Sequence, residues 1–286
     1  MTERISQKGI ILGATGFIGS ILSKHLANAG NELILVGTSK EALSQLKSDI
    51  YDLSGNFVRT IEISKTNFDM YKFCLELQDY ENNIDFYINT IGTQPPLGNF
   101  IDLHFEEWFQ NFEVNFKLNA RLLQFFVRNF AKRGAGSAIV FSGGGSSNSR
   151  PQFSAYASGK TALVRLVEIV AQESFPFGVK INAIAPGVMP SKMQKEILAN
   201  QSILHNSEII KAKESLNSEF YDTEKITDLI DFLISDKSEG ISGKLISADW
   251  DNWTDWPNWI DELKNSELYT LRRITSKDLN KESGSI

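Results

Sequence analysis

The sequence has 286 residues, of which 42% are hydrophobic and 22% charged, a composition typical of a globular protein with one large core. Its net charge of −6, with basic residues dispersed along the chain, argues against binding to nucleic acid or to an anionic membrane surface. Cys74 is the only cysteine, which excludes an intramolecular disulfide and a cysteine metal cluster and favours a reducing cytoplasm.

The N-terminal segment has no long apolar stretch followed by a small-residue cleavage site. The chain also lacks a run of roughly 18 apolar residues, the length needed to span a bilayer. We therefore expect a soluble, cytoplasmic protein that does not enter a membrane.

Short apolar runs alternate with longer segments of helical periodicity. The runs that predict buried strands are Gly9–Leu12, Leu33–Val36, Phe57–Ile61, Phe86–Asn89, Ala138–Phe141, Lys180–Ala183 and Lys244–Ile246. Apolar residues at three- and four-residue spacing predict helices over Phe17–Ala29, Trp108–Phe130 and Ala155–Glu173. Strands that alternate with helices imply right-handed crossovers and a parallel sheet with helices on both faces. The sequence therefore predicts a single-domain α/β fold with a doubly wound, Rossmann-type sheet over residues 1–248.

A glycine-rich turn follows the first predicted strand. Glycine permits a tight turn and close backbone approach, and the N-terminus of the next helix presents free N–H groups to a pyrophosphate. The residues predicted to bind a dinucleotide here are Gly13, Thr15, Gly16, Phe17, Ile18 and Gly19. The alternative interpretation is a tight turn that binds no ligand.

Thr38, Ser39 and Lys40 follow the end of the second predicted strand, and no carboxylate is present there. A carboxylate at this point would hydrogen-bond the ribose 2′-hydroxyl of NAD(H) and repel a 2′-phosphate, whereas hydroxyl and ammonium groups donate to a phosphate. The segment therefore favours NADP(H), with NAD(H) as the alternative. In a second interpretation these three residues only start the next helix.

Tyr156 and Lys160 lie four residues apart at the start of a predicted helix. Side chains at this spacing share a helix face, so the phenol and the ammonium can point into one cleft. A nearby cation favours the phenolate, and Tyr156 can then accept a hydroxyl proton during oxidation or donate one to a carbonyl oxygen during reduction. The same spacing is common in surface pairs, so the neighbouring motifs decide between the two interpretations.

Two segments interrupt the alternation of strands and helices. Residues 191–221 are polar, helix-prone and inserted before the last strand, which predicts a substrate lid. The tail, residues 249–286, carries four tryptophans between aspartates: Trp250, Trp253, Trp256 and Trp259. Aromatic faces beside carboxylates can bind a sugar, but we favour packing against a neighbouring subunit. The histidines have no paired spacing, so we predict no metal site: His25, His104 and His205.

In their order and intervals, these motifs resemble those of the short-chain dehydrogenase/reductase family over residues 8–248. Besides the glycine turn and the Tyr156 and Lys160 pair, the resemblance rests on further landmarks. These are Glu62 and Ile63 at the adenine, Asn89, Thr90, Ile91 and Gly92 after the fourth strand, Asn115 on a helix, Ser142 after the fifth strand, and Pro186, Gly187 and Val188 after the sixth. As a set, these landmarks are highly specific.

The resemblance implies a role for each catalytic landmark. Lys160 is expected to bind the nicotinamide ribose and to lower the pKa of Tyr156, and Asn115 helps to hold a water and the lysine. Ser142 steadies the substrate oxygen, with Ser146 and Ser147 as alternatives if Ser142 only caps the loop. The family usually forms homodimers or homotetramers through the two long predicted helices.

The glycine spacing is that of the longer "extended" members, many of which act on nucleotide sugars. The chain after Tyr156 is too short for their separate substrate domain, so the body resembles the single-domain type. This implies reversible hydride transfer between NADP(H) or NAD(H) and a small molecule, which is a carbonyl compound or a secondary alcohol. In one interpretation this substrate is derived from a sugar. The alternatives are a nucleotide-sugar epimerase or dehydratase and a non-enzymatic dinucleotide-sensing protein.

Overall fold

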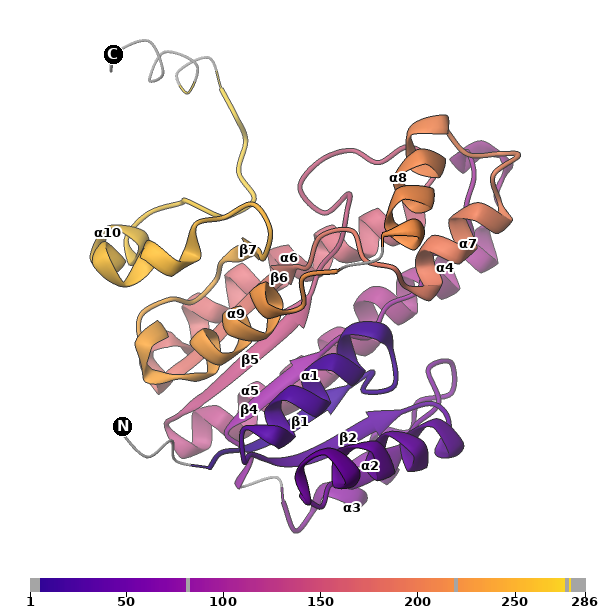
Figure 1. Ribbon diagram of the computed structural model, residues 1–286. Helices are drawn as coiled ribbons and strands as arrows, with labels where there is room; N and C mark the ends of the chain where they lie inside the picture. The colour runs from indigo at the N-terminus through magenta and orange to yellow at the C-terminus, as the bar shows by residue number, and fades with distance from the viewer. Residues whose placement is uncertain (1–5, 81–82, 219–220, 276–277, 279–286) are drawn as a thin grey trace.

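Seven parallel strands form one sheet in the computed structural model, which describes residues 6–80, 83–218, 221–275 and 278 (Figure 1). The strands are β1 (Lys8–Leu12), β2 (Glu32–Gly37), β3 (Arg59–Glu62), β4 (Phe86–Asn89), β5 (Gly136–Phe141), β6 (Val179–Ala185) and β7 (Leu245–Ser247). The predicted parallel sheet is confirmed, and most of the strand boundaries differ from the predicted ones by one or two residues. The prediction that the third strand starts at Phe57 was wrong, because that side chain is 78% exposed and its ring lies against Tyr51 outside the sheet.

The strands are ordered β3-β2-β1-β4-β5-β6-β7, and every neighbouring pair is parallel. Their carboxyl ends therefore share one edge of the sheet. The direction of winding reverses between β1 and β4, and in such sheets ligands bind in the crevice at this reversal. The fold thus places the glycine turn after β1 and the predicted motif after β4 next to each other.

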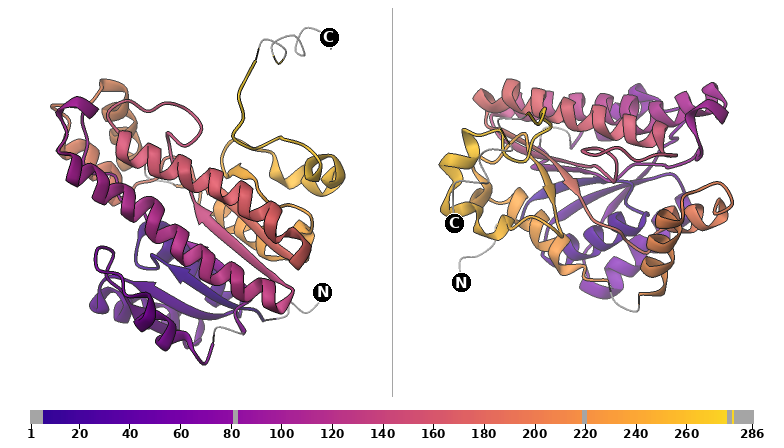
Figure 2. Two further views of the ribbon diagram at one scale, coloured as in Figure 1. Left: turned by 180° about the vertical axis from the view of Figure 1, so that it is seen from behind. Right: turned by 90° about the horizontal axis from the view of Figure 1, so that it is seen from above.

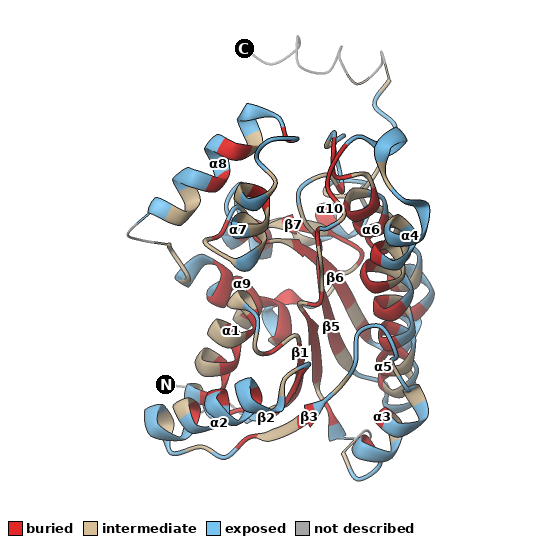
Figure 3. Ribbon diagram, turned by 90° about the vertical axis from the view of Figure 1, so that its right-hand side faces the viewer, coloured by how far each residue is buried: buried red, intermediate tan, exposed pale blue. Residues whose placement is uncertain are grey.

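Helices cover both faces of the sheet (Figure 3). The main helices are α1 (Phe17–Asn28), α2 (Lys40–Ser54), α3 (Met70–Leu77), α4 (Phe105–Phe112), α5 (Asn119–Arg133), α6 (Ser154–Ser174), α7 (Lys192–Ala199), α8 (Asn206–Asn217), α9 (Glu224–Ile234) and α10 (Ile260–Lys264). One apolar core lies under α1, α2 and α9, and a second lies under α3, α5 and α6. Helices α5 and α6 run side by side over one face of the sheet (Figure 2).

The predicted helix over 108–130 is interrupted. Between α4 and α5 the backbone forms a π-helix over Glu113–Leu118, and Asn115 lies within it. Helix α6 packs directly on this turn, since a Cβ added at Gly159 would lie 2.9 Å from the Cβ of Asn115. A π-turn inside an α-helix is a rare feature that often marks a functional site.

The tryptophan-rich tail closes the core under α1, α2 and α9. Trp253 and Trp256 are buried there, and the ring of Trp256 lies 4.6 Å from that of Tyr269. Both interpretations of the tail were therefore wrong for these two residues, because their own chain covers the rings that a sugar or a second subunit would need. Trp250 differs, being 86% exposed. Residues 276, 277 and 279–286 of the predicted tail lie outside the described residues.

We expect Trp256→Ala to lower the free energy of unfolding by about 3–5 kcal/mol, because it would leave a large cavity in a core. Chemical denaturation followed by circular dichroism measures this change, with Trp250→Ala as the exposed control. A loss below about 1 kcal/mol would show that the tail contributes little to the core.

None of the described helices combines the length and the apolarity that a membrane crossing requires. Nor do the described residues contain a group of three or more histidines, cysteines or carboxylates that could hold a metal ion.

Candidate active site

The glycine turn after β1 is shaped by close contacts. Gly13 has φ of +76°, a conformation that favours glycine. A Cβ added at Gly19 would lie 2.1 Å from the carbonyl oxygen of Gly13, so α1 starts directly on the turn. Gly16 precedes α1 and provides no side-chain cap, which leaves the first N–H groups of the helix available to a phosphate.

A cavity of about 350 Å³ opens in front of this turn. The predicted cofactor residues that line it are Gly13, Thr15, Gly16, Phe17, Ile18, Thr38, Ile63, Thr90, Ile91 and Gly92. Thr90 also ties two strand ends together, because its hydroxyl donates to the carbonyl of Leu12 at 2.9 Å. The glycine turn offers free N–H groups at the point where the direction of winding reverses, and this arrangement fits a dinucleotide.

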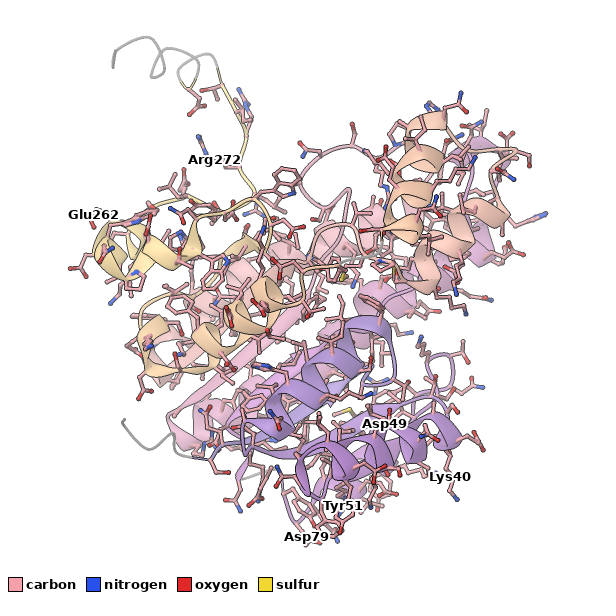
Figure 4. All side chains as sticks on the ribbon, in the orientation of Figure 1. Lys40, Asp49, Tyr51, Asp79, Glu262 and Arg272 are labelled. Carbon is pink, nitrogen blue, oxygen red and sulfur yellow. The ribbon has the colours of Figure 1, made fainter. Side chains whose placement is uncertain are left out.

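Several predicted cofactor residues do not line this cavity, among them Ser39, Lys40 and Asn89. The hydroxyl of Ser39 accepts from the backbone N–H of Ala42 at 3.1 Å and thereby caps α2, so it does start the next helix. Lys40 is exposed on α2 and points away from the sheet (Figure 4). Asn89 is buried and accepts from the N–H of Ile91 at 3.0 Å, so it shapes the loop after β4.

Lys65 is a cavity residue that sequence reasoning missed. Together with Thr38 it lines the main cavity and an adjoining hollow, to which the predicted Glu62 also belongs. Its position in an irregular loop after β3 gives no pattern from which a ligand contact could have been predicted.

Tyr156 and Lys160 occupy the first turns of α6 and are almost fully buried. The ammonium of Lys160 donates to the carbonyl of Phe141 at 2.7 Å and to that of Ile91 at 3.0 Å. It thereby joins the carboxyl ends of β5 and β4, 6.0 Å from the centre of the Tyr156 ring. The expected pair is therefore inside the molecule, not on its surface.

Both side chains line a second cavity of about 290 Å³. Its walls share residues with the first cavity, among them Ile18, Thr90 and Gly92, so the two form one continuous cleft. The predicted Pro186, Gly187 and Val188 line only the second part. A cofactor in the first part and a small substrate in the second would meet at Tyr156.

Burial dominates the electrostatics of the pair. It raises the pKa of Tyr156 to about 12, and the nearby guanidinium of Arg150 opposes this rise. Burial also lowers the pKa of Lys160 to about 7. The guanidinium of Arg150 thus favours the phenolate, a contribution that the resemblance, which implied Lys160, did not include.

The structure distinguishes between the three candidate serines. Ser142 lines the second cavity, and its buried hydroxyl has no hydrogen-bond partner among the described residues. Ser146 is buried away from both cavities and Ser147 is exposed. A hydroxyl without a partner is costly unless a ligand supplies one, which favours Ser142.

Asn115 supports the site from behind. Its side-chain oxygen accepts from the N–H of Thr93 at 3.2 Å, and its amide donates to the carbonyl of the same residue at 2.8 Å. A Cβ added at Gly92 would lie 3.3 Å both from this oxygen and from the Lys160 ammonium. Asn115 therefore fixes the loop after β4, on which one acceptor of Lys160 lies.

Gly143 determines how closely the loop between β5 and α6, residues 142–153, which we call the catalytic loop, approaches Tyr156. A Cβ added at Gly143 would lie 2.0 Å from the phenol oxygen, so Gly143→Ala must displace the ring. We expect kcat to fall about 10²-fold, the usual effect of a misplaced catalytic group. Steady-state kinetics measures the effect, with Ser147→Ala on the same loop as the control. Unchanged kcat in a folded Gly143→Ala variant would contradict this role of the glycine.

Helices α7 and α8 contribute side chains to the second cavity. Sequence reasoning singled out this segment, but not the residues of its helices that line the cavity, which are Met193, Gln194, Glu208 and Lys211. Sequence reasoning also missed Arg150, which lines the second cavity. It is the one charged residue in the sequence between the three glycines at 143–145 and Tyr156.

The chain belongs to the short-chain dehydrogenase/reductase family. Residues 13–250 match the family model described as enoyl-(acyl carrier protein) reductase. Among related proteins, 7beta-hydroxysteroid dehydrogenase of Clostridium sardiniense is 27% identical over 186 residues, which cover 65% of this chain and 70% of that protein.

Two solved structures have the same fold. NAD⁺-bound xylitol dehydrogenase has a TM-score of 0.75 at 20% identity, covering 84% of this chain and 96% of that one. A short-chain dehydrogenase from Shigella flexneri complexed with NADP has a TM-score of 0.71 at 19% identity, covering 85% and 96%. At these identities the likeness concerns the fold alone. The family match makes this chain an NAD(P)-dependent oxidoreductase, and it does not favour the epimerase and sensor alternatives.

Proposed function

We propose that this enzyme transfers a hydride reversibly between NADP(H) and a small-molecule carbonyl or secondary alcohol, with Tyr156 as the general acid and base. One observation carries the proposal. The Tyr156 phenol, the Lys160 ammonium and the Ser142 hydroxyl, which has no hydrogen-bond partner among the described residues, are buried together along one cleft beside the glycine turn after β1. Such a convergence of polar groups in a cleft is characteristic of a catalytic site.

When bound, the nicotinamide supplies or accepts the hydride. The chain's own groups manage the proton and the orientation of the substrate. During reduction, the Tyr156 hydroxyl donates its proton to the carbonyl oxygen, and during oxidation the phenolate removes a proton from the alcohol. Ser142 donates a hydrogen bond to the same substrate oxygen, and Lys160 would donate to the ribose of the cofactor while it remains anchored to the ends of β4 and β5.

The test is turnover with a panel of ketones and secondary alcohols, followed by the absorbance of the reduced nicotinamide with NADPH and with NADH. Turnover that consumes the reduced cofactor in step with the ketone supports hydride transfer. Cofactor binding without any turnover on the panel would count against it.

The preference for NADP(H) is part of the proposal. Thr38 and the ammonium of Lys65 line the part of the cleft where β2 and β3 end, and both can donate to a 2′-phosphate. The solved relatives include one complexed with NADP and one bound to NAD⁺, so either cofactor suits the fold.

We expect Lys65→Glu to raise the Kd for NADP⁺ about tenfold more than the Kd for NAD⁺, since only the former carries the extra phosphate. Isothermal titration calorimetry measures both affinities. Lys47→Glu, an exposed charge reversal outside both cavities, is the control. Equal weakening of the two cofactors would contradict a 2′-phosphate contact.

We further propose that residues 191–221 act as the lid over the substrate and that the chain forms a homo-oligomer in the cytoplasm. Met193 and Ser191 line both parts of the cleft, as expected of a lid. Apolar side chains on and after α6, including Ile169 and Phe175, are almost half exposed on the outer face, where a second copy could cover them.

A further inference from the structure

The substrate part of the cleft contains more positive than negative charge. Beside the catalytic Lys160, it is lined by two cations, Arg150 and Lys211, and by one carboxylate, Glu208. The chain as a whole has a net charge of −6, so this local excess is opposite in sign to the rest of the molecule. Cations that line a cleft raise the local concentration of anionic ligands.

Glu208 holds Arg150 by one side of the guanidinium. The Nη2 and Nε atoms both donate to the same carboxylate oxygen, at 2.6 and 3.2 Å, and the two side chains are each 15% exposed. The guanidinium also lies over the ring of Phe153, 3.7 Å from its centre. These contacts fix the plane of the guanidinium, but within the described residues they leave Nη1 without an acceptor.

That remaining nitrogen faces the catalytic loop. The nearest atom to a Cβ added at Gly144 is Nη1 of Arg150, at 3.5 Å, and the nearest to a Cβ added at Gly143 is the Tyr156 hydroxyl, at 2.0 Å. The side chains of Tyr156 and Arg150 both line the second cavity, which has a volume of only about 290 Å³. A ligand that reaches Tyr156 therefore passes within reach of Arg150.

We infer that the substrate carries a carboxylate, which Nη1 of Arg150 binds while its other end lies at Tyr156. This inference rests on the proposed function and names its substrate class. Glu208 orients the guanidinium, and Lys211, 4.0 Å from the other oxygen of Glu208, adds a second positive charge at the rim. A planar guanidinium held on one side and open on the other is suited to carboxylate recognition.

The experiment compares hydroxy and keto acids with their amides, which match them in shape but lack the charge. Calorimetry measures the Kd of each compound for the protein saturated with NADP⁺, and turnover is followed separately. We expect at least one acid to bind about tenfold or more tightly than its amide, and Arg150→Gln to weaken the acid about 10- to 100-fold while the amide changes little. Arg150→Lys is expected to recover part of the loss.

Two controls separate the anion site from folding and from net charge. Lys213→Gln removes an exposed charge from the same helix as Lys211 outside the cleft, so the acid should bind as before, whereas Lys211→Gln should weaken it severalfold. Thermal melting establishes that each variant is folded. If every amide bound as tightly as its acid, or if folded Arg150→Gln kept the preference for acids, the inference would be overturned. Acids that bind but are never turned over would support the anion site and count against the proposed hydride transfer.

Discussion

Tyr156→Phe should lower kcat by about 10²- to 10⁴-fold in both directions while leaving the Kd for the cofactor nearly unchanged. This is the usual contribution of a positioned general acid or base, and the phenol oxygen is the only heavy atom that the substitution removes. Steady-state kinetics and a cofactor titration on the same variant provide both values. Turnover within a few-fold of the parent would mean that another group moves the proton.

The pH dependence should differ between the two directions. With a pKa near 12, Tyr156 is protonated at neutral pH, which is the form that reduction requires. Oxidation requires the phenolate, whose fraction increases about tenfold per pH unit below the pKa. We therefore expect kcat/KM for the alcohol to rise from about pH 6 to about pH 10 while that for the carbonyl stays flat. A flat profile for alcohol oxidation would contradict this role of Tyr156.

Lys160→Met should abolish most activity without destabilising the protein. Methionine has a similar length, but it offers no donor to the carbonyls of Ile91 and Phe141 or to the cofactor. We expect kcat/KM to fall at least about 10²-fold. The substitution removes a buried charge, which is stabilising, but it also leaves two buried carbonyls without this donor, which is destabilising, so the melting temperature should change little.

The stability difference between Lys160→Met and the parent should depend on pH in a defined direction. The folded pKa of Lys160 is about 7, below the ordinary value of 10.5, so the unfolded chain binds the extra proton between these two pH values. The stability of the parent protein contributed by this group is complete above pH 10.5 and is lost as the pH falls towards 7. The methionine side chain of the variant does not titrate, so the advantage of the variant should be largest below pH 7. Denaturation at about pH 6 and about pH 9.5 tests this, and a larger advantage at the higher pH would refute it.

Contacts between residues close together in the sequence could be predicted, whereas contacts between distant segments could not. The glycine turn and the Tyr156 and Lys160 pair could be predicted, because a few residues of one turn or one helix fix their geometry. Arg150 and Glu208 are 58 residues apart, and they meet only because α8 packs beside the catalytic loop. No spacing in the sequence encodes that contact.

Residue types with two uses also limited the prediction. The hydroxyl of Ser39 suits either a phosphate or a helix cap, and it serves as the cap. The tail tryptophans recur every three residues, but the sequence does not tell which of them meet the core. Trp256 is fully buried in the core to which α9 and β7 also contribute, whereas Trp250 is exposed.

The burial of Trp256 also bears on how the chain matures during synthesis. The core under α1, α2 and α9 is assembled mainly from the first and last parts of the chain, and Trp253 and Trp256 are among its last side chains to leave the ribosome. Until then, the apolar faces of those three helices have no complete cover. Nascent chains that end before Trp253 should therefore depend on chaperones far more than full-length chains do.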